Sequence, residues 1–595
     1  MNNQMIDPCQ PIDGWINLHA RKECEAYVLK KQRQLDKAVR DRDVDRIRHI
    51  TYLLSRCSRA VRIVAIERVT RTNSGKHTAG VDGVTTPKPR KDADLFRDKL
   101  LSKVKNDKMP SPIRRVYIPK SNGKKRPLGI PTIMDRVIQE IHRITIEPIS
   151  EYHFKDCSYG FRPKKSCQDA IERIFNKMSR RSAPQWVLEG DIKGCFDHID
   201  HDTIIIKMKE WKMAKPIRET VKRMLKSGII SDKGYSDSIV GTPQGGILSP
   251  MLANIALTTL DEWGESQKDK WGRKMNPIVR YADDFIVVCK TKKEAIRRKK
   301  EIKLLLQNGI GLELSDEKTS ITNIHEGFNF LGFNARKYTR KSLHDKYHTI
   351  GKLLIKPQKE KVQTFLDKCG DIIREARGHN LESLIRQLNP KLRGFTNFYR
   401  FVVSQKTFSH MTTTIKQEVF RMLRKSHPNK YRSWVWRRYS TDQSITLKTK
   451  TFRMKKEQLF LPVFMPIKRF TIVKMGMRVY DNSEETKVYW KKRAYSNTLN
   501  SIYSIGVEKR FKRQSGCCPI CRKMITGEQM GNGKVHTHHL NPQAESGDYK
   551  LTNLRLIHSD CHTELHRILS IEEMSKLAGA NIDYCHKDYL YETYV

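Results

Sequence analysis

The sequence has few acidic residues for its number of basic ones, since 65 Asp and Glu stand against 114 Lys and Arg. It contains no run approaching the ~18 apolar residues that a membrane span needs, and its first residues do not form the basic-then-apolar pattern of a secretory signal. The 13 Cys are an odd number and are scattered apart from one group near the C-terminus, so they do not predict a disulfide framework. These absences favour a reducing, cytoplasmic setting and no membrane partner.

The charge itself points to a partner. The formal net charge is +49 and the pI is near 9.9, and the basic residues are spread along the whole chain. Self-repulsion of this size disfavours a compact chain unless a polyanion neutralises it. Nucleic acid is therefore the partner we expect first, ahead of a merely soluble basic surface or an acidic membrane surface. The length of 595 residues predicts several folding units.

Periodicity divides the chain into regions of different character. Residues 20–70 predict helices, and a Gly-rich polar break follows at "NSGKHTAGVDG". Residues 113–131 predict two short strands joined by an Asn-Gly turn, and a mixed α/β region continues to about residue 345. Residues 356–440 predict basic helices rich in aromatic residues.

Two adjacent acids interrupt a run of apolar, β-branched residues in "NPIVRYADDFIVVCK", residues 276–290. We expect Asp283 and Asp284 at a tight hairpin turn, where a divalent cation would relieve their mutual repulsion. Magnesium suits such a site because it prefers hard oxygen ligands and leaves room for phosphates. Asp191, at the end of the apolar strand in "VLEGDIKGCFDHID", is a third candidate ligand for in-line phosphoryl transfer. The alternative for the acids is an ordinary surface turn.

The C-terminal Cys and His predict a zinc site. Cys518 and Cys521 have two residues between them, and His558 and Cys561 repeat that spacing. Two such knuckles favour tetrahedral Zn²⁺, which would stabilise a segment too small to build a large core. Cys517 is an alternative thiol.

A second His set lies inside this segment. "THHLNP" is followed by Asn553 and then by "CHTELH", in which His562 and His566 are four residues apart and share one helix face. A His with a pKa near neutrality suits proton abstraction. A structural role, or a role confined to zinc, is the alternative for each of these His residues.

The ordered blocks "IPKSNGKKRPLGIPT", "YGFRP", "DIKGCFD", "GTPQGGILSP", "YADD", "LSDEKT" and "FLGF" resemble those of group II intron-encoded reverse transcriptases and maturases over roughly residues 30–440. The resemblance implies a polymerase that uses dNTP substrates and holds its catalytic Mg²⁺ with Asp191, Asp283 and Asp284. It further implies that Lys120 and Arg126 contact the incoming triphosphate, that Gln244 lies beside the templating pair, that Phe196 is a sugar gate and that Lys318 supports the backbone near the primer. The alternative for Phe196 is a plain core aromatic.

The same resemblance extends to the helical and C-terminal regions. "LNPKLRGFTNFYR" and "HPNKYRSWVW" resemble the thumb-like maturase domain that grips intron RNA, although Phe395, Phe398 and Tyr399 suit a buried helix face better than base stacking. The His set resembles an HNH endonuclease motif, a ββα-metal unit. By that resemblance His538 and His562, with His566, bind the catalytic divalent ion, His539 is the general base and Asn553 holds the loop that orients it.

We therefore expect a multidomain α+β protein with a right-hand polymerase. The expected segments are a helical N-terminal extension (1–105), fingers and palm (106–345), a helical thumb/maturase domain (346–440), a small basic DNA-binding module (441–505) and an HNH domain with zinc knuckles (506–595). The resemblance implies retrohoming of an intron by target-primed reverse transcription, with intron RNA and double-stranded target DNA as partners. The alternatives are an RNA-binding splicing cofactor with a silent polymerase and a reverse transcriptase of another retroelement.

Overall fold

The chain forms two compact units. The computed structural model describes residues 18–585 except 105–108, 120–122, 124, 232–233, 238–240, 242–244, 270–271, 273–274, 342–348, 377–379, 443–449, 455–456, 503–504, 532, 544–547, 549 and 581. Unit 1 comprises Met1–Asn323 together with Ile472–Val488, and unit 2 comprises Ile324–Thr471 together with Tyr489–Val595. No helix in the described ranges is both long and apolar enough to cross a membrane.

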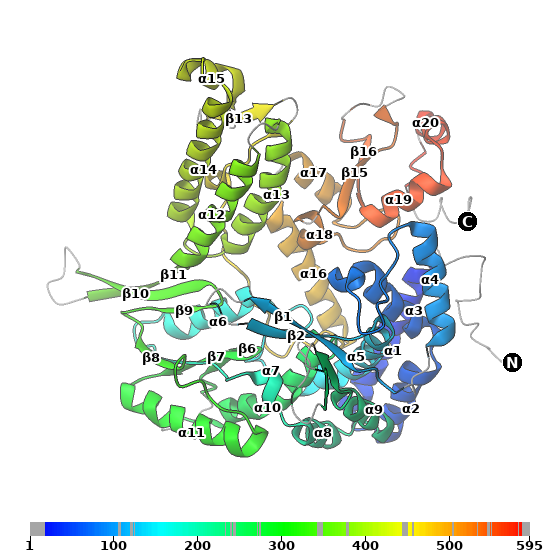
Figure 1. Cartoon of the computed structure of the whole chain (residues 1–595), viewed down its shortest axis with the longest axis vertical. Helices are drawn as coiled ribbons and strands as arrows, with labels where there is room; N and C mark the ends of the chain where they lie inside the picture. Colours follow the sequence, from blue (N-terminus) through cyan, green and yellow to red (C-terminus); the bar gives the residue numbers. More distant parts are fainter. Residues whose placement is uncertain are drawn as a thin grey trace. The chain divides into compact units, whose positions relative to one another are not determined.

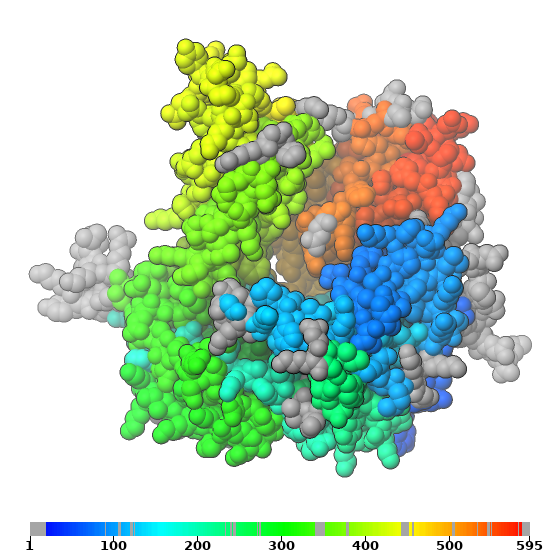
Figure 2. Space-filling model, viewed as in Figure 1, coloured from blue at the N-terminus to red at the C-terminus, as the bar shows by residue number. Residues whose placement is uncertain are grey.

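Unit 1 begins with helices, as the sequence predicts: α1 Leu18–Arg40, α2 Val44–Tyr52, α3 Arg59–Glu67 and α4 Arg90–Lys103. The side chains of Asp43 and Ser58 cap the first turns of α2 and α3 by accepting hydrogen bonds from backbone N–H groups. Helices α1 and α3 pack against α5 (Ile133–His153), which is buried along most of its length. In Figure 2 the blue N-terminal residues lie against the light-blue residues that follow them in unit 1.

The central sheet of unit 1 has the order β6-β7-β3-β8, and every neighbouring pair is antiparallel. Its strands are β3 Trp186–Gly190, β6 Ile278–Tyr281, β7 Asp284–Cys289 and β8 Ser320–Asn323. The Val and Ile residues of β6 and β7 are buried, as expected of β-branched residues in a covered sheet. Helices α10 Ser249–Ser266 and α11 Lys292–Ile310 contact the sheet and lie beneath it in Figure 1.

A second sheet of unit 1 has the order β2-β1-β4-β5. The predicted hairpin is confirmed, because β1 (Ile113–Pro119) and β2 (Lys125–Ile130) pair antiparallel. Short elements complete the unit: β4 Ile229–Ser231, β5 Gly234–Ser236, α6 Cys167–Met178, α7 Cys195–His198, α8 His201–Glu210 and α9 Lys215–Leu225.

A segment that is distant in sequence completes unit 1. Residues 472–488, which we name the strap, bind to it through buried polar contacts. The Tyr480 hydroxyl donates to Glu147 Oε2 at 2.7 Å, and the Val473 N–H donates to Asp169 Oδ1 at 2.8 Å. The strap lies within residues 441–505 and belongs to unit 1, while the residues that flank it belong to unit 2.

Unit 2 begins with the antiparallel sheet β11-β10-β9, followed by four helices. Their bounds are β9 Phe328–Phe330, β10 Phe333–Lys341, β11 Thr349–Pro357, α12 Lys359–Glu375, α13 Leu381–Tyr399, α14 Gln405–Ser426 and α15 Arg432–Tyr439. Helices α12, α13 and α14 lie side by side (Figure 1). Of the α13 aromatics, Phe395 stacks on Phe365 at 4.2 Å between ring centroids and Tyr399 is 5% exposed, as expected of a buried helix face. The expectation is wrong for Phe398, which is 37% exposed and covers Phe333 with one face of its ring.

The rest of unit 2 contains two small sheets and short helices. The first sheet is β12-β13-β14, and the second pairs β15 with β16. The bounds are β12 Ser440–Asp442, β13 Lys450–Met454, β14 Glu457–Gln458, α16 Glu484–Ser501, α17 Ile505–Arg513, α18 Gly527–Gly531, β15 Val535–His539, β16 Leu554–His558, α19 Ser559–Ile568 and α20 Ile571–Gly579; α16 starts in the strap. The mixed α/β architecture that the sequence predicts is confirmed.

Candidate active sites and metal centre

The register of the central sheet brings distant acids to one edge. The last pair between β3 and β7 is Gly190 with Phe285. Asp191 follows Gly190 and Asp284 precedes Phe285, so both acids lie at the same end of adjacent strands. Gly190 is required there, because a Cβ would lie 2.2 Å from the Phe285 ring.

The hairpin turn between β6 and β7 holds Asp283 in a constrained backbone. Ala282 has φ of +58°, a conformation that costs an L-residue about 1–2 kcal/mol. The Arg280 guanidinium donates to the Ala282 carbonyl at 2.9 Å. Gly160, from "YGFRP", lies so close that a Cβ would be 2.4 Å from the Ala282 nitrogen. These contacts fix the turn that presents Asp283 and Asp284.

The Arg280 side chain was not singled out from the sequence. It is fully buried and donates to both carboxylate oxygens of Asp261, at 2.8 and 2.5 Å, to Asn254 Oδ1 at 2.8 Å and to Ser158 Oγ at 2.8 Å. The only signal available in the sequence was a charged residue inside the apolar strand "PIVRY". This network ties the turn to α10 and to the "CSYGFRP" segment.

The acids perturb one another. Burial, together with the charges of Asp283 and Asp191, raises the pKa of Asp284 to about 6 although this residue keeps an exposed surface. Burial is also the main cause that raises the pKa of Asp283, and the charge of Asp191 adds to it. A cation bound between these carboxylates would stabilise their charged forms and so lower the pKa values of Asp283 and Asp284.

Two predicted basic residues face the acids. Lys318 Nζ lies 2.9 Å from Asp191 Oδ2, and the charges of Lys318 and Arg126 both act to lower the pKa of Asp283. Phe196 is 9% exposed and belongs to the hydrophobic core of unit 1. Lys120 and Gln244 lie outside the described residues.

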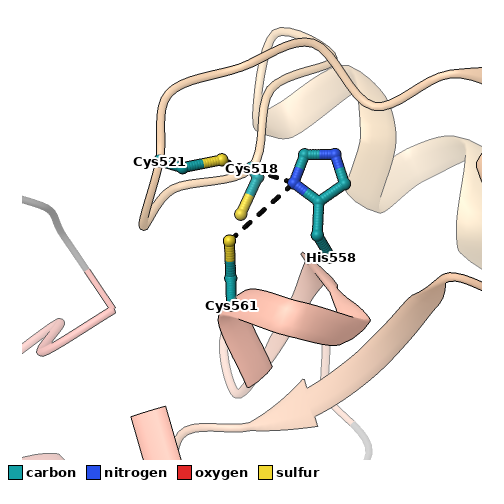
Figure 3. Close-up of side chains that lie close together, drawn as sticks. All are labelled: Cys518, Cys521, His558 and Cys561. Atoms are coloured by element: carbon teal, nitrogen blue, oxygen red, sulfur yellow. Dashed lines mark hydrogen bonds between the residues drawn. The ribbon is translucent and has the colours of Figure 1, made fainter. Parts of the chain in front are cut away.

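The four predicted zinc ligands come together (Figure 3). The ligand atoms of Cys518, Cys521, His558 and Cys561 all lie within 4.8 Å of one another. His558 turns Nδ1 toward the sulfurs, at 3.3 Å from Cys521 Sγ and 4.0 Å from Cys561 Sγ. Contacts with Cys518 and Cys521 raise the pKa of the Cys561 thiol, a cost that a cation would remove. Three sulfurs and one imidazole nitrogen fit a structural zinc ion.

Cys517 does not belong to this cluster. Its sulfur contacts the Ser515 carbonyl at 3.7 Å. The alternative assignment of Cys517 in place of Cys518 is therefore not supported by the geometry.

His538, His562 and His566 form a second cluster, again with ligand atoms within 4.8 Å of one another. His538 Nδ1 lies 3.2 Å from His562 Nε2, which lies 3.3 Å from His566 Nε2. Burial and the neighbouring His562 lower the pKa of His538 to about 3, so the ring stays neutral. Three neutral imidazoles with converging nitrogens fit a divalent ion. Within the described ranges only these two groups have three or more potential ligands gathered so closely; the polymerase acids do not.

His539 ends β15, and Asn553 directly precedes β16. His539 follows His538 on β15 and contacts Gln543 Nε2 at 3.3 Å through its own Nε2. Asn553 spans the base of the next loop: Oδ1 accepts from the Asn541 N–H at 2.7 Å, while Nδ2 donates to the carbonyls of Asn541 and Asp548 at 3.2 and 2.8 Å. Burial, together with the charge of Arg510, lowers the pKa of His539.

Four segments of the chain match known family models. Residues 118–335 match the reverse transcriptase (RNA-dependent DNA polymerase) family, 362–440 the maturase-specific domain of group II introns, 15–98 the N-terminal domain of reverse transcriptase and 518–567 the HNH endonuclease family.

Several curated proteins are similar over long stretches. The group II intron-encoded protein LtrA of Lactococcus lactis subsp. cremoris is 34% identical over 415 residues, which cover 55% of this chain and 67% of LtrA. Protein YkfC of Escherichia coli K12 is 36% identical over 300 residues, which cover 44% of this chain and 77% of YkfC. A 91 kDa protein in the cob intron of Schizosaccharomyces pombe is 29% identical over 443 residues, which cover 62% of this chain and 53% of that protein.

Proposed function

The chain belongs to the family of group II intron-encoded proteins, and on this premise we propose that it carries out intron retrohoming by target-primed reverse transcription. The chain is an RNA-directed DNA polymerase that also has a maturase-specific domain and an HNH endonuclease domain. In the proposed cycle it binds its intron RNA, stabilises the fold in which the RNA splices, and stays with the excised lariat. The RNA enters one DNA strand, the HNH domain nicks the other, and the freed 3′-hydroxyl primes cDNA synthesis.

The polymerase step is assigned to the acids at the sheet edge. Asp191, Asp283 and Asp284 would hold Mg²⁺, which activates a primer hydroxyl and stabilises the leaving pyrophosphate when bound. Arg126 carries the positive charge that would meet the triphosphate. Support comes from the strand register and from the raised pKa values of Asp283 and Asp284, since both favour a bound cation.

The remaining polymerase roles follow the family pattern. Lys318 would give up its ion pair with Asp191 when that carboxylate binds the metal, and it would support the backbone near the primer. Phe196 would lie under the sugar from the edge of the core. Lys120 and Gln244 would contact the triphosphate and the templating pair, respectively. RNA binding is assigned to α12–α15, in which most aromatic residues pack within unit 2 and leave Lys and Arg as the main contacts.

DNA cleavage is assigned to the His cluster. His538, His562 and His566 would hold a divalent ion that polarises the scissile phosphate. His539 would take the proton of the attacking water, because its lowered pKa keeps it neutral at physiological pH. Asn553 would hold the loop that positions Gln543 against His539. The Cys518, Cys521, His558 and Cys561 cluster would bind structural Zn²⁺ beside this site.

The observation that carries the proposal is the joint presence of a maturase-specific segment and an HNH segment in a chain that retains all three polymerase acids at one strand edge. A splicing cofactor with a silent polymerase has no physical need for Asp191, Asp283 and Asp284 together. A reverse transcriptase of another retroelement has no need for the maturase segment.

The test reconstitutes the ribonucleoprotein from the full chain and the excised intron RNA, and adds a DNA target that is intact on both strands. Asp284→Ala should abolish cDNA synthesis while RNA binding and nicking persist. His539→Ala should abolish nicking while extension of a supplied primer persists. The matched controls Asp316→Ala and His49→Ala, at exposed positions, should behave as the wild type. Extension by Asp284→Ala, or normal nicking by His539→Ala, would remove the role assigned to that residue.

A further inference from the structure

Tyr584 lies behind the His cluster and has no role in the assignments above. Its side chain is fully buried, and its hydroxyl lies 3.0 Å from His538 Nε2. The same hydroxyl contacts the Leu540 carbonyl. An ion pair holds this part of the chain in place, since Arg555 Nε and Nη2 lie 2.9 and 2.6 Å from Asp583 Oδ2.

The direction of these hydrogen bonds follows from the number of protons. A carbonyl only accepts, so the single Tyr584 proton is donated to the Leu540 carbonyl. The Tyr584 oxygen must then accept from His538, which requires a proton on Nε2 of that ring. His538 is 3% exposed, so water does not compete for this proton. The tautomer with a bare Nδ1 is therefore selected.

The His cluster can bind a metal only if His538 has this tautomer. His538 Nδ1 lies only 3.2 Å from His562 Nε2. In the other tautomer, Nδ1–H would donate to His562 and close the cluster with a His–His hydrogen bond. In the tautomer selected by Tyr584, His538 Nδ1 presents a lone pair to His562 Nε2. When His562 carries its own proton on Nδ1, both nitrogens present lone pairs to the same point, an arrangement that is favourable only around a cation.

We propose that Tyr584 is a positioning residue of the HNH metal site. Its hydroxyl keeps His538 in the tautomer whose Nδ1 can bind the divalent ion. This inference rests on the proposed metal site at His538, His562 and His566. Tyr584 touches neither the ion nor the substrate in this proposal; it acts through His538.

His536 provides an internal comparison. Its Nδ1 lies 3.2 Å from His562 Nδ1 and can accept the single N–H proton of that neutral ring, which leaves His562 Nε2 bare toward the cluster. His536 is exposed, and water can replace it after substitution. Loss of His536 should therefore weaken metal binding less than loss of the buried Tyr584 hydroxyl.

The experiment titrates Co²⁺ into the full chain with Zn²⁺ in the Cys518 cluster, and follows the visible absorption of Co²⁺ bound by His. Tyr584→Phe should weaken Co²⁺ binding about 10–100-fold, the usual cost of removing a group that orients a metal ligand. His536→Ala should weaken it less. The control Tyr431→Phe removes a hydroxyl from a residue that is 85% exposed and should change nothing.

A second readout follows the tautomer itself. In the metal-free chain labelled with ¹⁵N-histidine, the His538 resonances should report a proton on Nε2 in the wild type and a shift toward Nδ1 in Tyr584→Phe. An unchanged tautomer or unchanged Co²⁺ affinity in Tyr584→Phe overturns the positioning role while the metal site stands. Loss of Zn²⁺ from the Cys518 cluster in that variant overturns it too, because Tyr584 would then be a structural residue. Failure of the wild type to bind Co²⁺ through His would refute the metal site as well.

Discussion

Replacing Asp261 by Asn should damage the polymerase without touching any acid at the catalytic edge. Asp261 and Arg280 are fully buried, and their contacts at 2.8 and 2.5 Å are the main neutralisation of the Arg280 charge. Asn retains the shape but removes the charge, and it turns an N–H donor toward the guanidinium. Removing one partner of a buried pair costs about 3–5 kcal/mol. Because Arg280 also holds the Ala282 carbonyl, the turn should move and primer extension should fall about 10²-fold.

The measurements are thermal unfolding, amide hydrogen exchange in β6 and β7, and primer extension on RNA. The control is Asp316→Asn, since Asp316 pairs with Lys299 and Lys303 on the surface and its side chain is 61% exposed. A double variant, Asp261→Leu with Arg280→Met, separates the two effects. It should recover stability, because an apolar pair replaces the ions, but not activity, because the Ala282 carbonyl has lost its donor. Wild-type stability in Asp261→Asn would refute the reasoning.

Three further predictions concern other parts of the chain. Gly160→Ala should reduce primer extension and destabilise unit 1 by about 1–3 kcal/mol, because its Cβ would lie 2.4 Å from the Ala282 nitrogen, and full activity would contradict this close approach. The purified chain should contain about one tightly held Zn²⁺. Cys561→Ser should lose this ion, and the HNH segment should then unfold at a lower temperature. Metal analysis that finds no Zn²⁺ in the wild type would contradict the cluster assignment. Burial lowers the pKa of His142 to about 4 in the folded chain, whereas the ordinary pKa of His is about 6.5. As the pH falls from about 6.5 to about 4 the unfolded chain binds this proton and the folded chain does not, so the free energy of unfolding should fall by about 3 kcal/mol. In unfolding experiments His142→Leu should lose this part of the pH dependence, and an unchanged pH dependence would contradict the buried neutral ring.

The sequence predicts local structure and ligand spacing well where neighbouring residues determine them. The hairpin at 113–131, the N-terminal helices and the helices after residue 356 follow from periodicity and turn residues. The zinc candidates could be identified because both Cys-x-x-Cys-like pairs are short-range patterns. The meeting of Asp191 with Asp284 was expected from family resemblance, and its physical cause is the pairing of β3 with β7.

Contacts between distant segments could not be read in the same way. Arg280 interrupts an apolar strand, but no sequence pattern connects it with Asp261, and only folding shows that they neutralise one another inside the protein. Tyr584 stands 46 residues after His538, in a stretch without periodicity. The binding of the strap to unit 1 could not be predicted either. Tyr480 and Glu147 are 333 positions apart, and no pattern of spacing in the sequence indicates their hydrogen bond.

The strap has a consequence for how the protein is made. Domains usually fold as they leave the ribosome, from the N-terminus onward. Here the polymerase unit is completed by residues 472–488, so it cannot reach its final state until the whole maturase segment has been synthesised. Until then the Glu147 carboxylate on α5 lacks the hydrogen bond from the Tyr480 hydroxyl. A nascent chain that stalls before residue 472 would hold every polymerase acid and still lack a part of the polymerase.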